Sequence, residues 1–176
     1  LERTPVNGVS GDEKVLSEFV KGHLQAMSEH AESVISHMVK IGHGEEEKIR
    51  PRMESGINSA REFLFPDGKV SHARAGLLFI ESYRELPLLS WPRRLIDTVV
   101  ELEESMLLFR SHHARMVERM IGRRMGTGGS RGVDYLDMSI KYRIFTDLWA
   151  VRTMLLRRDI IPNPGNPEFY GFASNN

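Results

Sequence analysis

Residues 92–121 read PRRLIDTVVELEESMLLFRSHHARMVERMI. Pro92 suits the first turn of a helix, because the N–H that proline lacks is one that the first turn leaves unpaired. No further proline or glycine interrupts the run before Gly122, so the stretch predicts one continuous helix about 45 Å long. It is the longest element that the sequence predicts.

An apolar series runs along one side of this predicted helix. Successive members are three or four residues apart, and this spacing places their side chains on one face. We call the series the seam; its members are Val99, Leu102, Met106, Phe109, His113, Met116 and Met120. The seam is predicted to face the interior of the protein.

The seam contains one of two adjacent histidines. His113 belongs to it, whereas His112 is rotated about 100° away. An imidazole in apolar surroundings must still pair its ring nitrogens, since an unpaired buried polar atom costs about 1–3 kcal/mol. The partner can be a backbone carbonyl, a side chain of another helix, or a metal ion. The apolar neighbours suit the flat face of a haem better than a hydrated ion.

Helical patterns also occupy most of the remaining chain. The predicted helices run from the capping-box sequence Ser10-Gly-Asp-Glu13 to Ile41, from Pro51 to Phe65, from after Ser71 to before Pro87, from Pro92 to Ile121, and from Asp134 to about Arg158. The proline-containing tail from Asp159 is predicted to be irregular, and no β pattern is recognised. We therefore predict an all-α fold, a bundle of about five main helices in a single domain of residues 1–176.

The composition excludes several functional classes. Charge is balanced at 24 Lys+Arg and 24 Asp+Glu, so no overall attraction to nucleic acid or to an anionic membrane is expected. The absence of cysteine excludes disulfides, thiolate nucleophiles and cysteine ligands to zinc or haem. No apolar run approaches the roughly 20 residues of a membrane span, and no signal-peptide pattern opens the chain. We expect a cytoplasmic protein with a small-molecule partner, and the first residue, Leu1, leaves room for a preceding segment.

A glycine-rich segment, Gly126-Thr-Gly-Gly-Ser130, follows the long helix. Glycine permits positive φ and close approach, which leaves backbone N–H groups and the two hydroxyls as directed donors. The segment lacks the pattern of a phosphate-binding loop and does not follow a strand. It is either an ordinary connection or a clamp over a ligand that His113 also contacts.

Several segments of the second half together resemble the tryptophan 2,3-dioxygenase superfamily. They are Glu101-Leu-Glu-Glu, Phe109-Arg-Ser-His-His-Ala-Arg-Met-Val-Glu-Arg-Met-Ile-Gly122, Gly126-Thr-Gly-Gly-Ser130, Val133-Asp-Tyr-Leu136 and Phe145-Thr-Asp-Leu-Trp-Ala-Val-Arg-Thr153. The resemblance covers about residues 99–156, and the order of the motifs is specific.

The resemblance implies an all-helical oxygenase that binds a b-type haem. His113 would be the axial iron ligand, with Phe109, Met116 and Val117 beside the cofactor. The substrate-binding segment would comprise Gly126, Thr127, Gly128, Gly129 and Ser130, with Thr127 on the ammonium group of an amino acid. The resemblance also implies a homo-oligomer, either a dimer or a tetramer.

The first half departs from the dioxygenases, since only Gly11-Asp12-Glu13 echoes their early motifs. This compact first half is more similar to that of the haem-dependent L-tyrosine hydroxylases of the same superfamily. We therefore expect hydroxylation of L-tyrosine to L-DOPA, with dioxygen or hydrogen peroxide as oxidant. The alternatives are tryptophan 2,3-dioxygenation to N-formylkynurenine, oxygenation of a tryptophan derivative, and a haem-binding sensor without turnover.

The first predicted helix offers a distal acid–base group. His23, His30 and His37 are seven residues apart and share a face. We select His23 as the catalytic candidate, because an imidazole can hydrogen-bond the oxidant and exchange a proton near neutral pH. The alternative is a solvated polar stripe. Glu45, Glu46 and Glu47 are interpreted as the charged start of a helix rather than as metal ligands.

Overall fold

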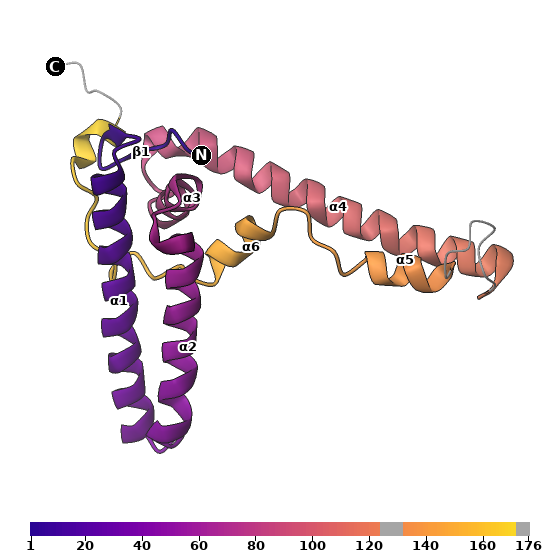
Figure 1. The fold of residues 1–176 in the computed structure, drawn as a ribbon, viewed down its shortest axis with the longest axis horizontal. Helices are drawn as coiled ribbons and strands as arrows, with labels where there is room; N and C mark the ends of the chain where they lie inside the picture. The colour runs from indigo at the N-terminus through magenta and orange to yellow at the C-terminus, as the bar shows by residue number, and fades with distance from the viewer. Residues whose placement is uncertain (124–131, 172–176) are drawn as a thin grey trace. The chain divides into compact units, whose positions relative to one another are not determined.

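The computed structural model describes residues 1–123 and 132–171. These residues form six α-helices joined by short turns, which confirms the predicted all-α class (Figure 1). The helices are α1 (Glu13–Lys40), α2 (Glu46–Leu64), α3 (His72–Ser82), α4 (Ser90–Ile121), α5 (Val133–Ser139) and α6 (Thr146–Arg152). Single 3₁₀ turns lie at Pro66–Gly68, Pro87–Leu89 and Pro167–Tyr170. None of the described helices combines the length and the apolarity that a membrane crossing requires.

The described residues divide into two compact units. The first unit contains Leu1–Arg93 together with Ala150–Asn176, and the second contains Arg94–Trp149. Helices α4 and α6 each contribute residues to both. The single domain of residues 1–176 stays a prediction.

The core of the first unit is built around α3, whose residues from Ala75 to Ser82 are all buried. An aromatic cluster packs against it: the Phe79 ring lies 5.2 Å from that of Phe19, 4.7 Å from Tyr83 and 5.3 Å from Tyr170. Burial of such large rings supplies the hydrophobic stabilisation of this unit. The predicted irregular tail thus contributes Tyr170 to the core.

A two-stranded β-hairpin precedes α1, although no strand is predicted. Strands β1 (Pro5–Val6) and β2 (Val9–Ser10) pair antiparallel, and the turn residues Asn7 and Gly8 have φ of 51° and 82°. An Asn-Gly pair with two positive φ angles is the preferred two-residue hairpin turn, so the signal is present in the sequence. The Tyr170 hydroxyl accepts a hydrogen bond from the N–H of Gly8 at 2.8 Å and donates one to the carbonyl of Pro5 at 2.7 Å.

The boundaries of α1 and α3 agree with the sequence to within a few residues, whereas α2 begins before the predicted start at Pro51. The cap of α1 is Asp12, whose carboxylate accepts from the N–H groups of Lys14 (2.8 Å) and Val15 (3.2 Å). α2 begins at Glu46, as expected for the charged start of a helix, and Pro51 therefore lies inside it rather than in its first turn. A proline in this position removes one backbone donor.

The last predicted helix, from Asp134 to about Arg158, is wrong as a continuous element. The chain instead forms α5 and α6, which are separated by residues 140–145. The break has a polar cause, because the N–H groups of Ile144 and Phe145 donate to the Glu103 carboxylate instead of to helix carbonyls. A buried carboxylate on α4 thus holds the residues just before α6 in a non-helical conformation.

Candidate functional site

Helix α4 positions His113 on a half-buried surface of the second unit. The Phe109 ring lies one turn earlier, nearly parallel to the imidazole, with 5.9 Å between ring centroids and 8° between planes. Within residues 1–123 and 132–171, neither ring nitrogen of His113 has a hydrogen-bond partner. The imidazole is therefore free to accept a ligand such as a metal ion.

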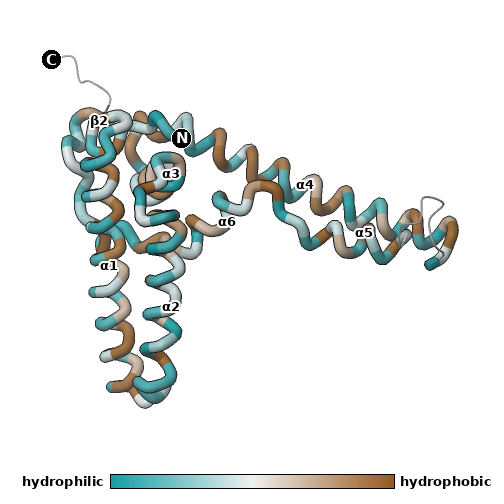
Figure 2. Tube along the Cα trace, viewed as in Figure 1, coloured by the Kyte–Doolittle hydropathy of each residue, from teal (hydrophilic) through white to brown (hydrophobic). Residues whose placement is uncertain are grey.

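The seam does not face the interior of the second unit, and this part of the prediction is wrong. The side chains of Phe109 and Met120 are 68% and 75% exposed, and those of Leu102 and Met116 are also exposed. The buried residues of α4 are Ile96, Glu103 and Ala114, which lie on another face of the helix. Figure 2 shows hydrophobic residues recurring along α4. The spacing identified the apolar face of α4 correctly. The face that the rest of the second unit covers is a different one, which carries Ile96, Glu103 and Ala114.

Glu103 explains which face of α4 is covered in the second unit. Its side chain is 1% exposed and accepts hydrogen bonds from the N–H of Phe145 at 3.0 Å, from the N–H of Ile144 and from the indole N–H of Trp149. Arg143 stacks over the Trp149 ring at 3.8 Å and lies 3.7 Å from the carboxylate. Burial alone would raise the pKa of Glu103, but these hydrogen bonds and the Arg143 charge lower it. The resemblance included Glu103 without revealing this role.

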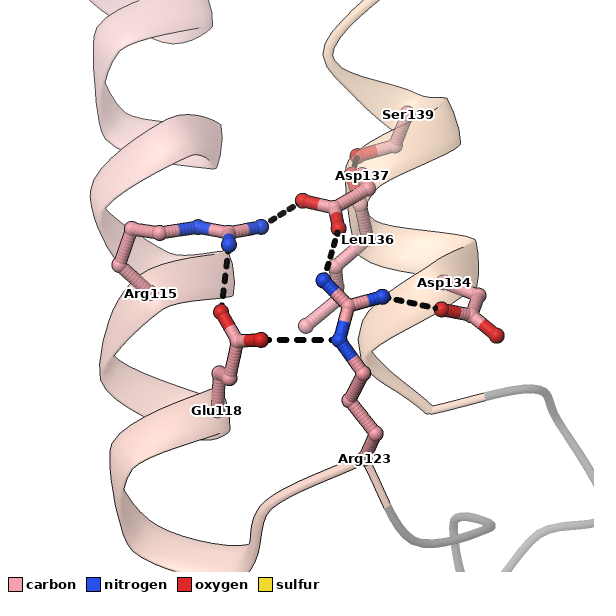
Figure 3. A network of polar contacts seen from close by, with 7 residues as sticks. All are labelled: Arg115, Glu118, Arg123, Asp134, Leu136, Asp137 and Ser139. Carbon is pink, nitrogen blue, oxygen red and sulfur yellow. Dashed lines mark hydrogen bonds and ion pairs between the residues drawn. The ribbon is translucent and has the colours of Figure 1, made fainter.

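A network of ion pairs joins the end of α4 to α5 (Figure 3). Arg123 donates to Glu118 and Asp134, both at 2.9 Å, and lies 3.7 Å from Asp137. Arg115 pairs with Glu118 and Asp137 from the preceding turn of α4. The network therefore holds together the two stretches of chain that flank residues 124–131.

A shallow depression of about 550 Å³ lies on α4 beside the seam. It is lined by His112, Arg115, Met116, Arg119 and Met120. Arg115 is committed to the ion-pair network, whereas Arg119 has no ion-pair partner in the described part of the chain. Arg119 is thus an arginine at this surface that is free to bind a carboxylate. His112 is exposed, whereas His113 is half-buried.

His23 lies in the first unit and is 2% exposed. Its Nε2 lies 2.9 Å from the carbonyl oxygen of Met154, so the proton is assigned to Nε2 and Nδ1 remains an acceptor. Burial lowers the pKa of His23, and the hydrogen bond to Met154 only partly opposes this shift. A cavity of about 240 Å³ borders the ring, with Glu18, Asn163 and Tyr83 among its lining.

The remaining candidates lie either at exposed or half-buried positions or outside the described part of the chain. Gly126, Thr127, Gly128, Gly129 and Ser130 fall outside residues 1–123 and 132–171. Met116 is exposed and Val117 is half-buried, both on α4 near His113. His37 is exposed, and His30 is half-buried on α1. Within the described residues, no three His, Asp or Glu side chains converge into a metal-binding cluster.

Comparison with known proteins completes the description of the site. The family model for tryptophan 2,3-dioxygenase matches residues 11–155, which include both His23 and His113. The chain belongs to the tryptophan 2,3-dioxygenase family. Proteins of this family are haem-iron oxidoreductases. The predicted superfamily is therefore confirmed.

Proteins of similar sequence carry the name tryptophan 2,3-dioxygenase or tryptophan 2,3-dioxygenase-like protein. The chain is 40% identical to tryptophan 2,3-dioxygenase 2 of Ralstonia nicotianae and 42% identical to tryptophan 2,3-dioxygenase of Sorangium cellulosum, in each case over 98% of its length. It covers 50% and 45% of those proteins, so it spans about half the length of the relatives it matches. It is 43% identical to a tryptophan 2,3-dioxygenase-like protein of Xanthomonas campestris, of which it covers 68%. None of these names refers to tyrosine, so the expected place in the L-tyrosine hydroxylase branch is not supported.

Proposed function

We propose that the chain binds haem through His113 and takes part in the oxidative opening of the indole ring of L-tryptophan. In this reaction both atoms of dioxygen enter the substrate across the indole C2–C3 bond, and N-formylkynurenine is the product. The family match and the names of the relatives support this substrate. The proposal replaces the expectation of tyrosine hydroxylation.

One observation carries the proposal: the imidazole of His113 has no hydrogen-bond partner in the described residues and lies on an exposed apolar face. A nitrogen donor among Phe and Met side chains fits the flat, apolar macrocycle of haem and its need for an axial ligand. Haem, when bound, supplies the iron that activates dioxygen. The chemistry of the donor set therefore agrees with the cofactor of the family.

The chain's own residues would bind and orient the cofactor and the substrate. Phe109, Met116 and Val117 would pack against the macrocycle, and their exposed area would be removed from water on binding. Arg119, which lines the depression beside Met116 and Met120, would pair with a propionate or a substrate carboxylate. By family resemblance, Thr127 within Gly126–Ser130 would hold the substrate ammonium group.

His23 is proposed as the proton-exchanging residue. The buried ring is held in one tautomer by the carbonyl of Met154, which leaves Nδ1 as an acceptor beside a cavity. The lowered pKa keeps the ring neutral at pH 7, and a neutral imidazole is the form that accepts a proton.

Self-association of the chain into a dimer or tetramer belongs to the same proposal.

Substitution of the two adjacent histidines tests the haem ligand. We expect His113→Ala to abolish the absorption spectrum of histidine-ligated haem, because the substitution removes the axial nitrogen. His112→Ala is the matched control on the next residue of α4, and it should leave the spectrum largely intact. The measurement is the visible spectrum of each variant after reconstitution with haem. The reverse pattern would contradict the assignment.

A product assay tests the reaction itself. Reconstituted protein is offered tryptophan and tyrosine separately, each with dioxygen and with hydrogen peroxide. N-formylkynurenine from tryptophan supports the proposal, whereas a catechol from tyrosine would support the hydroxylase alternative. A red protein that makes neither product would identify a haem-binding sensor instead.

A further inference from the structure

The first unit contains a groove that the proposed function does not use. It has a volume of about 430 Å³ and lies between α1 and α2, which run side by side (Figure 1), against residues 153–156. Its walls are mainly apolar, with Met27, Met53, Ile57 and Met154 among them. The volume lies within the range of about 300–1,000 Å³ that is typical of small-molecule sites, and methionine side chains adapt to varied ligand shapes.

Arg52 brings a positive charge to this groove. It lines the groove together with the imidazole of His30, and no aspartate or glutamate of the described residues does so. Two residues before Arg52, the Arg50 guanidinium is occupied by Glu32 at 2.5 and 3.0 Å and by Glu46 at 2.8 Å. Arg52 has no such partner among residues 1–123 and 132–171. The groove therefore combines an apolar wall with an unpaired guanidinium.

The floor of the groove is fixed by a hydrogen bond. The carbonyl of Met154 accepts from His23 Nε2 at 2.9 Å, which holds residues 153–156 against α1. The Thr153 hydroxyl is also engaged, since it donates to the carbonyl of Ala150 at 2.7 Å. A wall whose backbone is already held in place loses less conformational entropy when a ligand binds.

We propose that this groove binds a small organic acid, with its apolar body between α1 and α2 and its carboxylate on Arg52. A guanidinium pairs with a carboxylate through two parallel hydrogen bonds, and His30 can supply a further donor. The groove offers no carboxylate to an ammonium group. It therefore selects acids that lack an α-amino group, and it shares no residue with the His113 surface.

Isothermal titration of the purified chain with indole-3-propionate and with L-tryptophan tests this selectivity. Both probes carry an indole and a carboxylate, but only tryptophan carries an ammonium group. We expect indole-3-propionate to bind the groove more tightly. Arg52→Gln should weaken its binding by about tenfold or more, since a charge-assisted pair is lost. Arg61→Gln removes the same charge from an exposed position of α2 outside this groove and should change nothing.

A second variant tests the apolar part of the groove. A Cβ added at Gly56 meets no heavy atom within 4 Å, so the leucine of Gly56→Leu can enter the open space of the groove. Leucine also favours the helix over glycine, so the melting temperature should hold or rise while indole-3-propionate binding is lost. Gly22→Leu is the control, because Gly22 is equally open but borders a different cavity.

Three results would overturn the proposal. One is that indole-3-propionate gives no binding at millimolar concentration. Another is that L-tryptophan binds the groove as tightly as indole-3-propionate. The third is that Arg52→Gln and Gly56→Leu both bind the acid like the unchanged chain. All three are binding measurements that need no turnover, and Arg52→Gln separates binding in the groove from binding at the proposed substrate site, with which the groove shares no residue.

Discussion

The two units of the chain are stabilised in different ways. In the first unit, Phe79 packs among Phe19, Tyr83 and Tyr170, and nearly the whole of α3 is buried. In the second unit, the centre of the contact between α4 and the segment before α6 is the carboxylate of Glu103. Much of the apolar surface of α4 remains exposed.

This difference separates a unit held together mainly by apolar burial from one held together mainly by polar contacts. Apolar burial is insensitive to pH and salt, whereas hydrogen bonds to a carboxylate and surface ion pairs depend on both. An exposed apolar face on a 32-residue helix is costly unless it has a ligand or a partner. The second unit therefore carries the exposed apolar face on which the proposed haem ligand His113 lies, and polar contacts maintain its shape.

The largest expected effect is in the first core. Phe79→Ala removes a fully buried ring with three aromatic neighbours and should lower the free energy of unfolding by about 3–5 kcal/mol. The loss should be nearly independent of pH between 5 and 8. Urea unfolding followed by circular dichroism measures it. A loss below about 1 kcal/mol would show that α3 is not the centre of this core.

Substitution of Glu103 should loosen the second unit by a smaller amount. Glu103→Gln keeps the shape but places an amide against three N–H donors, which should cost about 2–3 kcal/mol. The fluorescence of Trp149, measured in a Trp91→Phe background, reports the change in this unit. Amide exchange in the peptides of α3 should stay slow; faster exchange there would argue against separate stabilisation of the units.

The same variant has a predicted pH signature. Because the pKa of Glu103 is lowered from 4.5 in the folded chain, its contribution is complete above that pH and is lost as the pH falls below it. The unchanged chain should therefore lose stability in acid more steeply than Glu103→Gln does. Melting curves between pH 3 and pH 7 measure the difference, and parallel curves would contradict the lowered pKa.

Replacement of His23 tests a polar contact inside the apolar unit. His23→Ala removes the hydrogen bond to Met154 and should cost about 1–3 kcal/mol at pH 7. The pKa of His23 is lowered from 6.5, so the folded chain disfavours the protonated ring; its contribution is complete above pH 6.5 and falls as the pH drops below that value. Melting temperatures at pH 5 and pH 7.5 should therefore converge in the variant. An unchanged gap would reject the assignment.

The smallest effect is expected in the network of Figure 3. Arg123→Gln breaks contacts with Glu118 and Asp134 that are exposed, so the free energy of unfolding should change by less than about 1 kcal/mol. The effect should shrink further in 1 M salt because screening weakens the remaining attraction. Thermal melts at low and high salt give the comparison. A large, salt-independent loss would show that the network does more than join α4 to α5.

The sequence predicted the positions of the helices better than the contacts that these helices make. Local signals such as the polar start of α1 and the long apolar spacing of α4 placed these two helices within a few residues, although Asp12 rather than Ser10 caps α1 and α2 begins before Pro51. The hairpin at Asn7-Gly8 was missed although its turn signal is local. The single helix predicted over residues 134–158 failed because its interruption depends on Glu103, 30 or more residues away in the chain.

The order of residues in the chain was enough to mark an apolar helical face, to place His113 on it and to separate it from His112. Those conclusions follow from the 3.6-residue period of the helix, which every local stretch of sequence contains. Tertiary structure decided which face of α4 is covered, which carboxylate is buried and which arginines are already paired. These outcomes depend on contacts between residues far apart in the chain, and no local period encodes them.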